Sequence, residues 1–144
     1  MLSLGLGLTA CRPLSRIVEL LANSGGPFTT TANVSTIGVT KTLSNGALVL
    51  TAQDGNADRG EWALSGLDVG QSYLFEIEAE ATGPSAFFYS FTWGSVEETP
   101  ITTRQTYSQE IVATATSGVC RIYAASSGSA GDTVSVYRIS VKRA

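Results

Sequence analysis

The 144-residue sequence contains no histidine, only two cysteines and few charged side chains. Histidine is the commonest general base near neutral pH and a frequent metal ligand, so its absence removes the usual acid–base and zinc chemistry. Two cysteines are too few for a disulfide framework. Without a Ser/His/Asp, Cys/His or metal-binding combination, the sequence predicts a protein that is not an enzyme.

Charge and hydropathy exclude two further kinds of partner. Charged residues make up 15% of the chain and the formal net charge is −3, which leaves no broad basic field for nucleic acid. No apolar run reaches the roughly 18 residues that a membrane-spanning helix needs. We therefore expect neither nucleic acid nor a membrane as the partner.

The segment from Leu67 to Glu80 alternates strictly between two kinds of side chain. After a turn that ends at Gly70, one set is apolar or aromatic and the other is mainly acidic. Side chains on a strand point alternately to opposite faces, so this pattern indicates a strand with one face in a core. The two faces are Tyr73, Phe75, Ile77 and Ala79, and Leu74, Glu76, Glu78 and Glu80.

Short segments of this kind recur from residue 27 to the C-terminus, separated by Gly, Asn, Asp and Ser turns. About eight antiparallel strands at this spacing predict an all-β sandwich or barrel in one domain, residues 27–144. The last strand changes phase, and a β-bulge near Val136 would reconcile its two halves. The predicted strands are Val34–Thr40, Ala47–Ala52, Glu61–Leu64, Gln71–Ala81, Ala86–Trp93, Thr106–Thr114, Val119–Ala125 and Thr133–Lys142.

Three of these segments together carry a resemblance to a known family. SNGALVLTAQ, LDVGQSYLFEIEAEATG and GDTVSVYRISVKRA follow one another in the order and spacing of the jelly-roll β-sandwich of carbohydrate-binding modules. The resemblance spans roughly residues 30–142 and implies a jelly-roll fold. The motifs are mostly structural, so they imply no particular ligand.

The first 26 residues form a separate region, with two interpretations that remain open. Leu2, Leu4, Leu6 and Leu8 alternate with small or polar residues, which predicts an extended arm whose leucine face docks on the domain or on a neighbour. Alternatively, Leu8-Thr9-Ala10-Cys11 resembles a bacterial lipobox, with Cys11 as the acylated residue. An export signal needs positively charged residues before its apolar run, and here no Lys or Arg precedes that run. We therefore favour the arm.

A short helix is predicted after Pro13, which suits the first turn of a helix. Leu14, Ile17, Val18 and Leu21 would share one helical face, and Asn23-Ser24-Gly25-Gly26 would end the helix. So short a helix must bury this face to be stable. It could cap one end of its own sandwich or contact another subunit.

The whole layout, a leucine-glycine arm joined to a jelly-roll module, also resembles small accessory proteins of tailed-phage virions. This resemblance implies a virion component anchored through its arm, with capsid or tail proteins as partners and identical copies assembled together. Capsid decoration or a head fibre is the first expectation. The alternative is an exported lipoprotein of the bacterial cell envelope or a secreted carbohydrate-binding module.

The segment Ala86–Trp93 is rich in aromatic residues, and Phe87, Tyr89, Phe91 and Trp93 would share one face. Sugar-binding proteins stack sugar rings on exposed aromatic side chains. Because phenylalanine has no polar tip, we favour the wall of a core for this row and for Trp62.

Trp93, Tyr89 and Trp62 are therefore candidate glycan contacts only if their face is open. Gln71, Arg104 and the row Glu76, Glu78 and Glu80 would be their polar neighbours. We expect no strong glycan affinity in the isolated domain. By default the acidic row is a solvated face, with a partner's Arg or Lys as the alternative.

Asp54, Asn56 and Asp58 place oxygen atoms at alternate positions, as a calcium loop does. The sixth position is Arg59 instead of glycine, and the twelfth is Ser65 instead of glutamate. We therefore favour a polar hairpin turn and no cofactor, with a structural calcium as the alternative. Cys120 alternates in phase with Ile122 and Ala124, so we expect a buried free thiol and no bond to Cys11.

Overall fold

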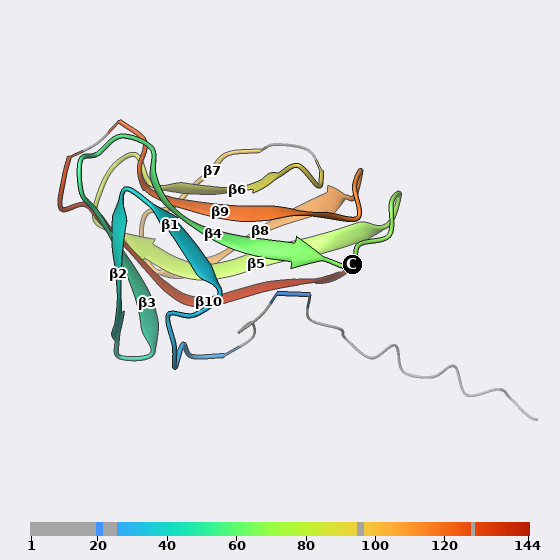
Figure 1. The fold of residues 1–144 in the computed structure, drawn as a ribbon, viewed down its shortest axis with the longest axis horizontal. Coiled ribbons are helices and arrows are strands. Elements are labelled where there is room, and N and C mark those ends of the chain that lie inside the picture. The colour runs from blue at the N-terminus through green and yellow to red at the C-terminus, as the bar shows by residue number, and fades with distance from the viewer. Residues whose placement is uncertain (1–19, 22–25, 95–96, 128) are drawn as a thin grey trace, which may run out of the picture.

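The computed structural model describes residues 20–21, 26–94, 97–127 and 129–144. They form two antiparallel five-stranded sheets that lie face to face as two layers (Figure 1). Sheet A has the strand order β1-β4-β9-β6-β7, and sheet B has the order β2-β3-β10-β5-β8. The strands are β1 Val34–Ile37, β2 Val39–Ser44, β3 Ala47–Ala52, β4 Asp58–Ser65, β5 Ser72–Ala81, β6 Phe87–Phe91, β7 Thr99–Pro100, β8 Gln105–Val112, β9 Ser117–Ala125 and β10 Thr133–Arg143.

The architecture confirms the predicted all-β sandwich, with ten strands in the described residues instead of eight. The two-residue strand β7 was not predicted, and the predicted strand Val34–Thr40 is divided between the sheets at Gly38. Gly38 has a φ of 65°, and a Cβ atom there would lie 2.0 Å from Oδ1 of Asp58. Glycine suits both the left-handed backbone and this close approach, so Gly38 allows the chain to pass from sheet A to sheet B at this point.

The core fills the space between the sheets. Strand β5 behaves as its alternation predicts, because Tyr73, Phe75, Ile77 and Ala79 are all buried. Full burial of each large apolar side chain contributes about 1.5–3 kcal/mol, so the shared core is the main stabilising feature. The largest fully buried side chains are Trp62, Trp93, Tyr73, Phe75, Phe88, Leu48, Leu50, Ile77, Ile101, Ile111, Ile122 and Ile139.

Strand β10 contains the predicted bulge. Its pairing with β5 shifts register between Val136 and Arg138, which leaves Tyr137 as the extra residue. Val134 and Val136 before the bulge, and Ile139 and Val141 after it, are all fully buried. The bulge therefore keeps both halves of the strand in phase with the core.

The predicted N-terminal helix is not supported where the structure describes it. Leu21 forms an isolated antiparallel bridge with Leu64 and is buried in the sandwich core. The N–H of Leu20 donates a hydrogen bond to the carbonyl of Val141. Leu21 therefore packs on its own domain in an extended conformation, which corrects its assignment to a helix. No helix long and apolar enough to cross a membrane occurs among the described residues.

The other residues of the predicted arm and helix lie outside the described residues. These are Leu2, Leu4, Leu6, Leu8, Cys11, Leu14, Ile17 and Val18. Their docking role and the boundary between residues 1–26 and 27–144 stay predictions.

Candidate functional site

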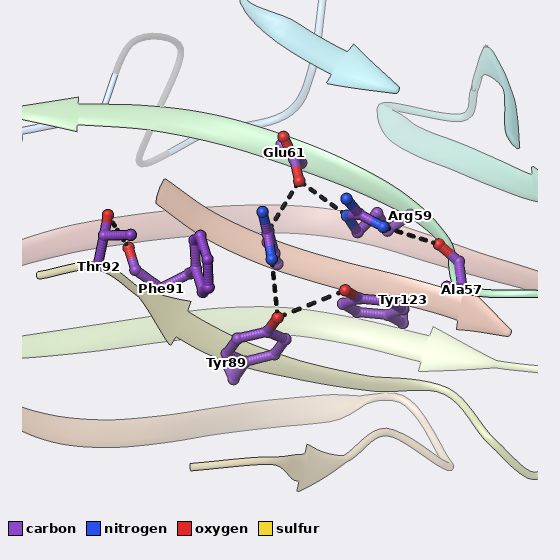
Figure 2. Close-up of polar contacts among 8 residues, drawn as sticks. Ala57, Arg59, Glu61, Tyr89, Phe91, Thr92 and Tyr123 are labelled. Atoms are coloured by element: carbon purple, nitrogen blue, oxygen red, sulfur yellow. Dashed lines mark hydrogen bonds and ion pairs between the residues drawn. The ribbon is translucent and has the colours of Figure 1, made fainter. Parts of the chain in front are cut away.

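The face of sheet A that points away from the core carries a cluster of aromatic and charged side chains. On β6, Phe88 is fully buried in the core, so Phe87, Tyr89 and Phe91 point to the opposite face. On β9, Cys120 and Ile122 are core residues, so Arg121 and Tyr123 point to the outer face by the same alternation. On β4, Trp62 is a core residue, so Glu61 points to the outer face. The aromatic–arginine cluster consists of Arg59, Glu61, Phe87, Tyr89, Phe91, Arg121 and Tyr123. Figure 2 labels five of its members, Arg59, Glu61, Tyr89, Phe91 and Tyr123.

Strand pairing places these side chains in rows across three neighbouring strands. Arg59 of β4 pairs with Tyr123 of β9, which pairs with Phe87 of β6. In the next row Glu61 pairs with Arg121, which pairs with Tyr89. Directly opposed residues on adjacent strands have neighbouring side chains, so the register itself assembles the cluster.

Three of the rings stack on one another. The rings of Phe87 and Tyr123 are 4.5 Å apart and inclined by 11°. The ring of Tyr89 lies 5.7 Å from Tyr123 and 5.9 Å from Phe87, at angles of 20° and 24°. This stacking shields the two tyrosines, which are only 8% and 7% exposed, whereas Phe87 and Phe91 are half-buried. The accessible apolar surface of the cluster thus comes mainly from the two phenylalanines.

The charged groups of the cluster converge on a single oxygen atom. Oε1 of Glu61 lies 2.7 Å from Nε of Arg59 and 2.7 Å from Nε of Arg121. Arg121 also donates a 3.0 Å hydrogen bond to the hydroxyl of Tyr89. The guanidinium of Arg121 lies 3.6 Å from the ring centre of Phe91, and that of Arg59 lies 5.4 Å from the ring centre of Tyr123. The side chains of Arg59, Glu61 and Arg121 are 15–18% exposed, so their charges are sheltered but reachable from solvent.

Burial and neighbouring charges shift two pKa values in the cluster. Burial acts to lower the pKa of Arg121, but the hydrogen bond with Tyr89 and the negative charge of Glu61 outweigh it, and the pKa is raised. Burial, together with the hydrogen bond to Tyr89, raises the pKa of Tyr123 to about 12, although Arg59 and Arg121 act in the opposite direction. At neutral pH Arg121 is therefore charged and Tyr123 is neutral.

Of the three predicted glycan contacts, the structure places only Tyr89 in this cluster. Trp62 is 1% exposed and Trp93 is fully buried, so both rings belong to the core. The favoured core position of Trp62 is confirmed. Neither tryptophan has a ring face on which a sugar could stack.

The expectation that the whole row from Phe87 to Trp93 lines the core is wrong for the first three aromatic residues. They share a face as predicted, but it is the outer one. Strand β6 ends at Phe91, and Thr92 adopts a φ of 69°. This left-handed residue turns Trp93 back into the core, which strict alternation could not show.

The polar neighbours proposed from sequence lie elsewhere, on sheet B and its loops. Glu76, Glu78 and Glu80 point away from the core on β5, but they contact groups of their own chain. Glu76 pairs with Lys142 at 2.7 Å and Glu78 with Arg104 at 2.9 Å. Glu80 accepts a hydrogen bond from Tyr137. Gln71 lies just before β5, and its side-chain amide donates a hydrogen bond to the backbone carbonyl of Ser72.

Arg104 also borders a cavity at the surface of the domain. It measures about 710 Å³ and lies at one end of sheet B, and its lining includes Glu80, Arg104 and four threonines. Its lining contains no aromatic ring. The guanidinium of Arg104 covers the nearby ring of Tyr137, at 3.6 Å from its centre. This end of sheet B is therefore a hollow without an aromatic stacking surface.

The candidate calcium loop is closed by hydrogen bonds. Asp58 is fully buried, and its Oδ2 accepts the backbone N–H groups of Gln53, Asp54 and Gly55 at 2.8, 3.1 and 2.9 Å. Burial acts to raise the pKa of Asp58, but these hydrogen bonds outweigh it and the pKa is lowered. Oδ1 of Asp54 accepts the N–H of Asn56. No group of three or more acidic, histidine or cysteine ligands is found among the described residues.

Cys120 is a buried free thiol, as predicted from its phase on β9. Burial raises its pKa well above the usual range, while the indole of Trp93 acts in the opposite direction. A thiol in this state is a packing residue and not a nucleophile.

Comparison with known proteins gives similarity in structure alone. No family model matches the sequence, and no curated protein matches it. The structure superposes on the second N-terminal cellulose-binding domain of Cellulomonas fimi β-1,4-glucanase C with a TM-score of 0.65 at 12% identity, covering 91% of this chain and 97% of that one. A family 29 carbohydrate-binding module gives 0.57 at 13% identity, covering 88% of each chain. The fold is a jelly-roll β-sandwich, as in these carbohydrate-binding modules.

The same jelly roll is similar to part of a phage protein. The enzymatically active domain of tailspike protein 4 of bacteriophage CBA120 gives a TM-score of 0.63 at 16% identity. The match covers 88% of this chain and 21% of that one. At such identities these matches report the fold and leave the ligand open.

Sequence reasoning missed most of the cluster, although one signal was present. Placing Cys120 and Ile122 in the core assigns Arg121 and Tyr123 to the outer face by alternation. The same argument from Trp62 places Glu61 on the outer face, and Arg59, two residues earlier, shares that face because the register shift lies between Asp58 and Arg59. What the sequence could not supply was the pairing of β4, β9 and β6, which are far apart in the chain.

Proposed function

We propose that this domain binds a glycan on the outer face of sheet A, through the aromatic–arginine cluster and without catalysis. The observation that carries the proposal is the meeting, on one sheet face, of stacked aromatic rings with two guanidinium groups, a carboxylate and two phenolic hydroxyls. The jelly-roll likeness to carbohydrate-binding modules supports it.

The chemistry of the cluster suits a sugar. One face of a sugar ring is apolar and packs on aromatic surface, here the accessible parts of Phe87 and Phe91. Sugar hydroxyls both donate and accept hydrogen bonds. Arg59 and Arg121 supply donors, Glu61 supplies an acceptor, and the hydroxyl of Tyr89 supplies either.

This proposal replaces the expectation of weak glycan binding, which depended on a core position for the aromatic row. Because Phe87, Tyr89 and Phe91 lie on the outer face, the reason for that expectation no longer holds.

The test is a glycan array followed by calorimetric titration of the best oligosaccharide. Phe87→Ala should abolish measurable binding while the domain stays folded. Tyr137→Ala is the matched control, since it removes a half-buried ring from the outer face of sheet B. Binding that survives Phe87→Ala but is lost in Tyr137→Ala would contradict the proposal.

We also propose that the domain is a component of a phage virion, anchored through the leucine face of residues 2–8. The alternating leucines and the likeness to part of a phage tailspike protein support this location. Four buried leucines at about 1.5–3 kcal/mol each could hold a small domain to a larger assembly. In that setting the glycan would belong to the host surface, and identical copies would bind it together with increased avidity. A head position, as decoration or fibre, and a tail position both agree with this proposal.

Deleting residues 2–10 tests the anchor. The truncated domain should stay folded and soluble but fail to join virions. Normal incorporation of the truncated protein would remove the anchor proposal. A diacylglyceryl group on Cys11, found by mass spectrometry of the native protein, would instead establish an exported lipoprotein.

A further inference from the structure

The aromatic–arginine cluster holds more positive than negative charge. Arg59 and Arg121 share one carboxylate, that of Glu61, and both approach the same oxygen atom of it. Neither guanidinium pairs with another carboxylate in the described part of the chain. The cluster therefore carries a net charge of about +1, in a chain whose formal net charge is −3.

This excess is sheltered from solvent. The side chains of Arg59 and Arg121 are 16% and 15% exposed, and a positive charge in such a position loses part of its hydration. The faces of Tyr123 and Phe91 offset part of this loss through cation–π contacts. A second anion beside the two arginines would compensate it further, because charges attract more strongly where water is partly excluded.

Sheet B provides the contrast. On its outer face Lys142 pairs with Glu76 and Arg104 pairs with Glu78, one cation to each carboxylate. Glu80 and Arg138, which lies opposite Glu78 in the strand register, add one further charge of each sign. These groups leave no excess of positive charge on sheet B, so an anionic ligand is favoured at the cluster on sheet A.

We propose that the glycan bound by the cluster is acidic, with a sugar carboxylate, as in a uronic acid, placed beside Arg59 and Arg121. This inference rests on the proposed glycan-binding function and specifies its ligand. The planar fork of a guanidinium group matches a carboxylate and can bind it through two parallel hydrogen bonds. Phe87 and Phe91 would then contact the apolar faces of the sugar rings.

The experiment uses the full chain and matched pairs of oligosaccharides. Uronic-acid oligomers are presented both as free acids and as their neutral methyl esters, beside neutral hexose oligomers on the same array. Methyl esterification removes the charge and leaves the sugar stereochemistry unchanged. Affinity for the best pair is then measured by calorimetry at low and high salt.

We expect the free acid to bind at least about tenfold more tightly than its ester, with a preference that shrinks as salt screens the charges. Arg59→Gln should reduce the preference for the acid, lowering the affinity for the acid more than the affinity for the ester, because it removes the excess positive charge while the pair of Glu61 with Arg121 remains. Arg104→Gln, on sheet B, is the control and should preserve the preference.

The experiment distinguishes failure of the acidic-ligand inference from failure of the proposed glycan binding. Neutral oligomers or esters that bind as tightly as the acids would overturn the acidic ligand and leave glycan binding in place. An array without any bound oligosaccharide would contradict the proposed function itself and the inference with it. The comparison of acid with ester uses the unaltered protein, so it does not depend on a variant that folds.

Discussion

Replacing Trp93 with alanine is expected to remove much of the domain's stability. The side chain is fully buried, its ring packs edge-on against Tyr73 at 6.5 Å, and its Cβ and Cδ1 lie against Gly118. Truncating a tryptophan in such a site costs about 3–5 kcal/mol, from lost transfer free energy and from the cavity left behind. Domains of this size lose roughly 3–5 °C in Tm per kcal/mol, so we expect Tm to fall by about 10–20 °C.

The assay is thermal and urea unfolding of the wild type and of Trp93→Ala, with Phe91→Ala as the matched control. Phe91 lies two residues earlier in the chain but on the outer face and half-buried, so its truncation should lower the free energy of unfolding by less than half as much. Equal losses in the two variants, or an unchanged Tm in Trp93→Ala, would refute the reversal of side-chain direction at Thr92.

Three further predictions concern close packing and the loop around Asp58. Gly118→Ala should destabilise the domain by about 1–3 kcal/mol in urea unfolding, because the added Cβ would lie 2.6 Å from Trp93 and 2.7 Å from the carbonyl oxygen of Phe91. Gly26→Ala is the control and should be neutral, since nothing lies within 4 Å of a Cβ added there. Equal stabilities of the two variants would contradict the close packing at Gly118. Asp58 has a lowered pKa when folded, so its stabilisation is present above about pH 4, the unfolded value, and is lost as the pH falls through the folded pKa. The difference in free energy of unfolding between wild type and Asp58→Asn should accordingly narrow below pH 4, and a constant difference would argue against an ionised Asp58. A chelator should leave Tm unchanged, since backbone N–H groups already satisfy Oδ2 of Asp58; a fall of many degrees would reveal a structural calcium ion.

Alternation along single strands predicted much of the fold. Glu76 and Phe75 are on opposite faces of β5 as expected, and the phase change in the last strand marked a real bulge at Tyr137. These features depend only on neighbours in the chain, so they are visible in one sequence.

Local pattern failed where the backbone departed from regular strand geometry. Because Thr92 has a left-handed backbone, Trp93 points into the core and not to the outer face that it would share with Phe91 in a regular strand. At Gly38 the chain passes from one sheet to the other, so the single predicted strand is two strands. The candidate site was harder still to predict, because Glu61, Tyr89 and Arg121 meet only through the pairing of strands β4, β9 and β6. That pairing is a long-range property, and the turn chemistry between strands does not specify it.

Mapping amide chemical-shift changes during titration with the best-bound oligosaccharide tests the central claim most directly. We expect the largest changes in β4, β6 and β9, centred on Glu61, Tyr89 and Arg121, with sheet B nearly unchanged. Changes centred instead on the cavity lined by Glu80, Thr102 and Arg104 would place the binding site on sheet B and contradict the account.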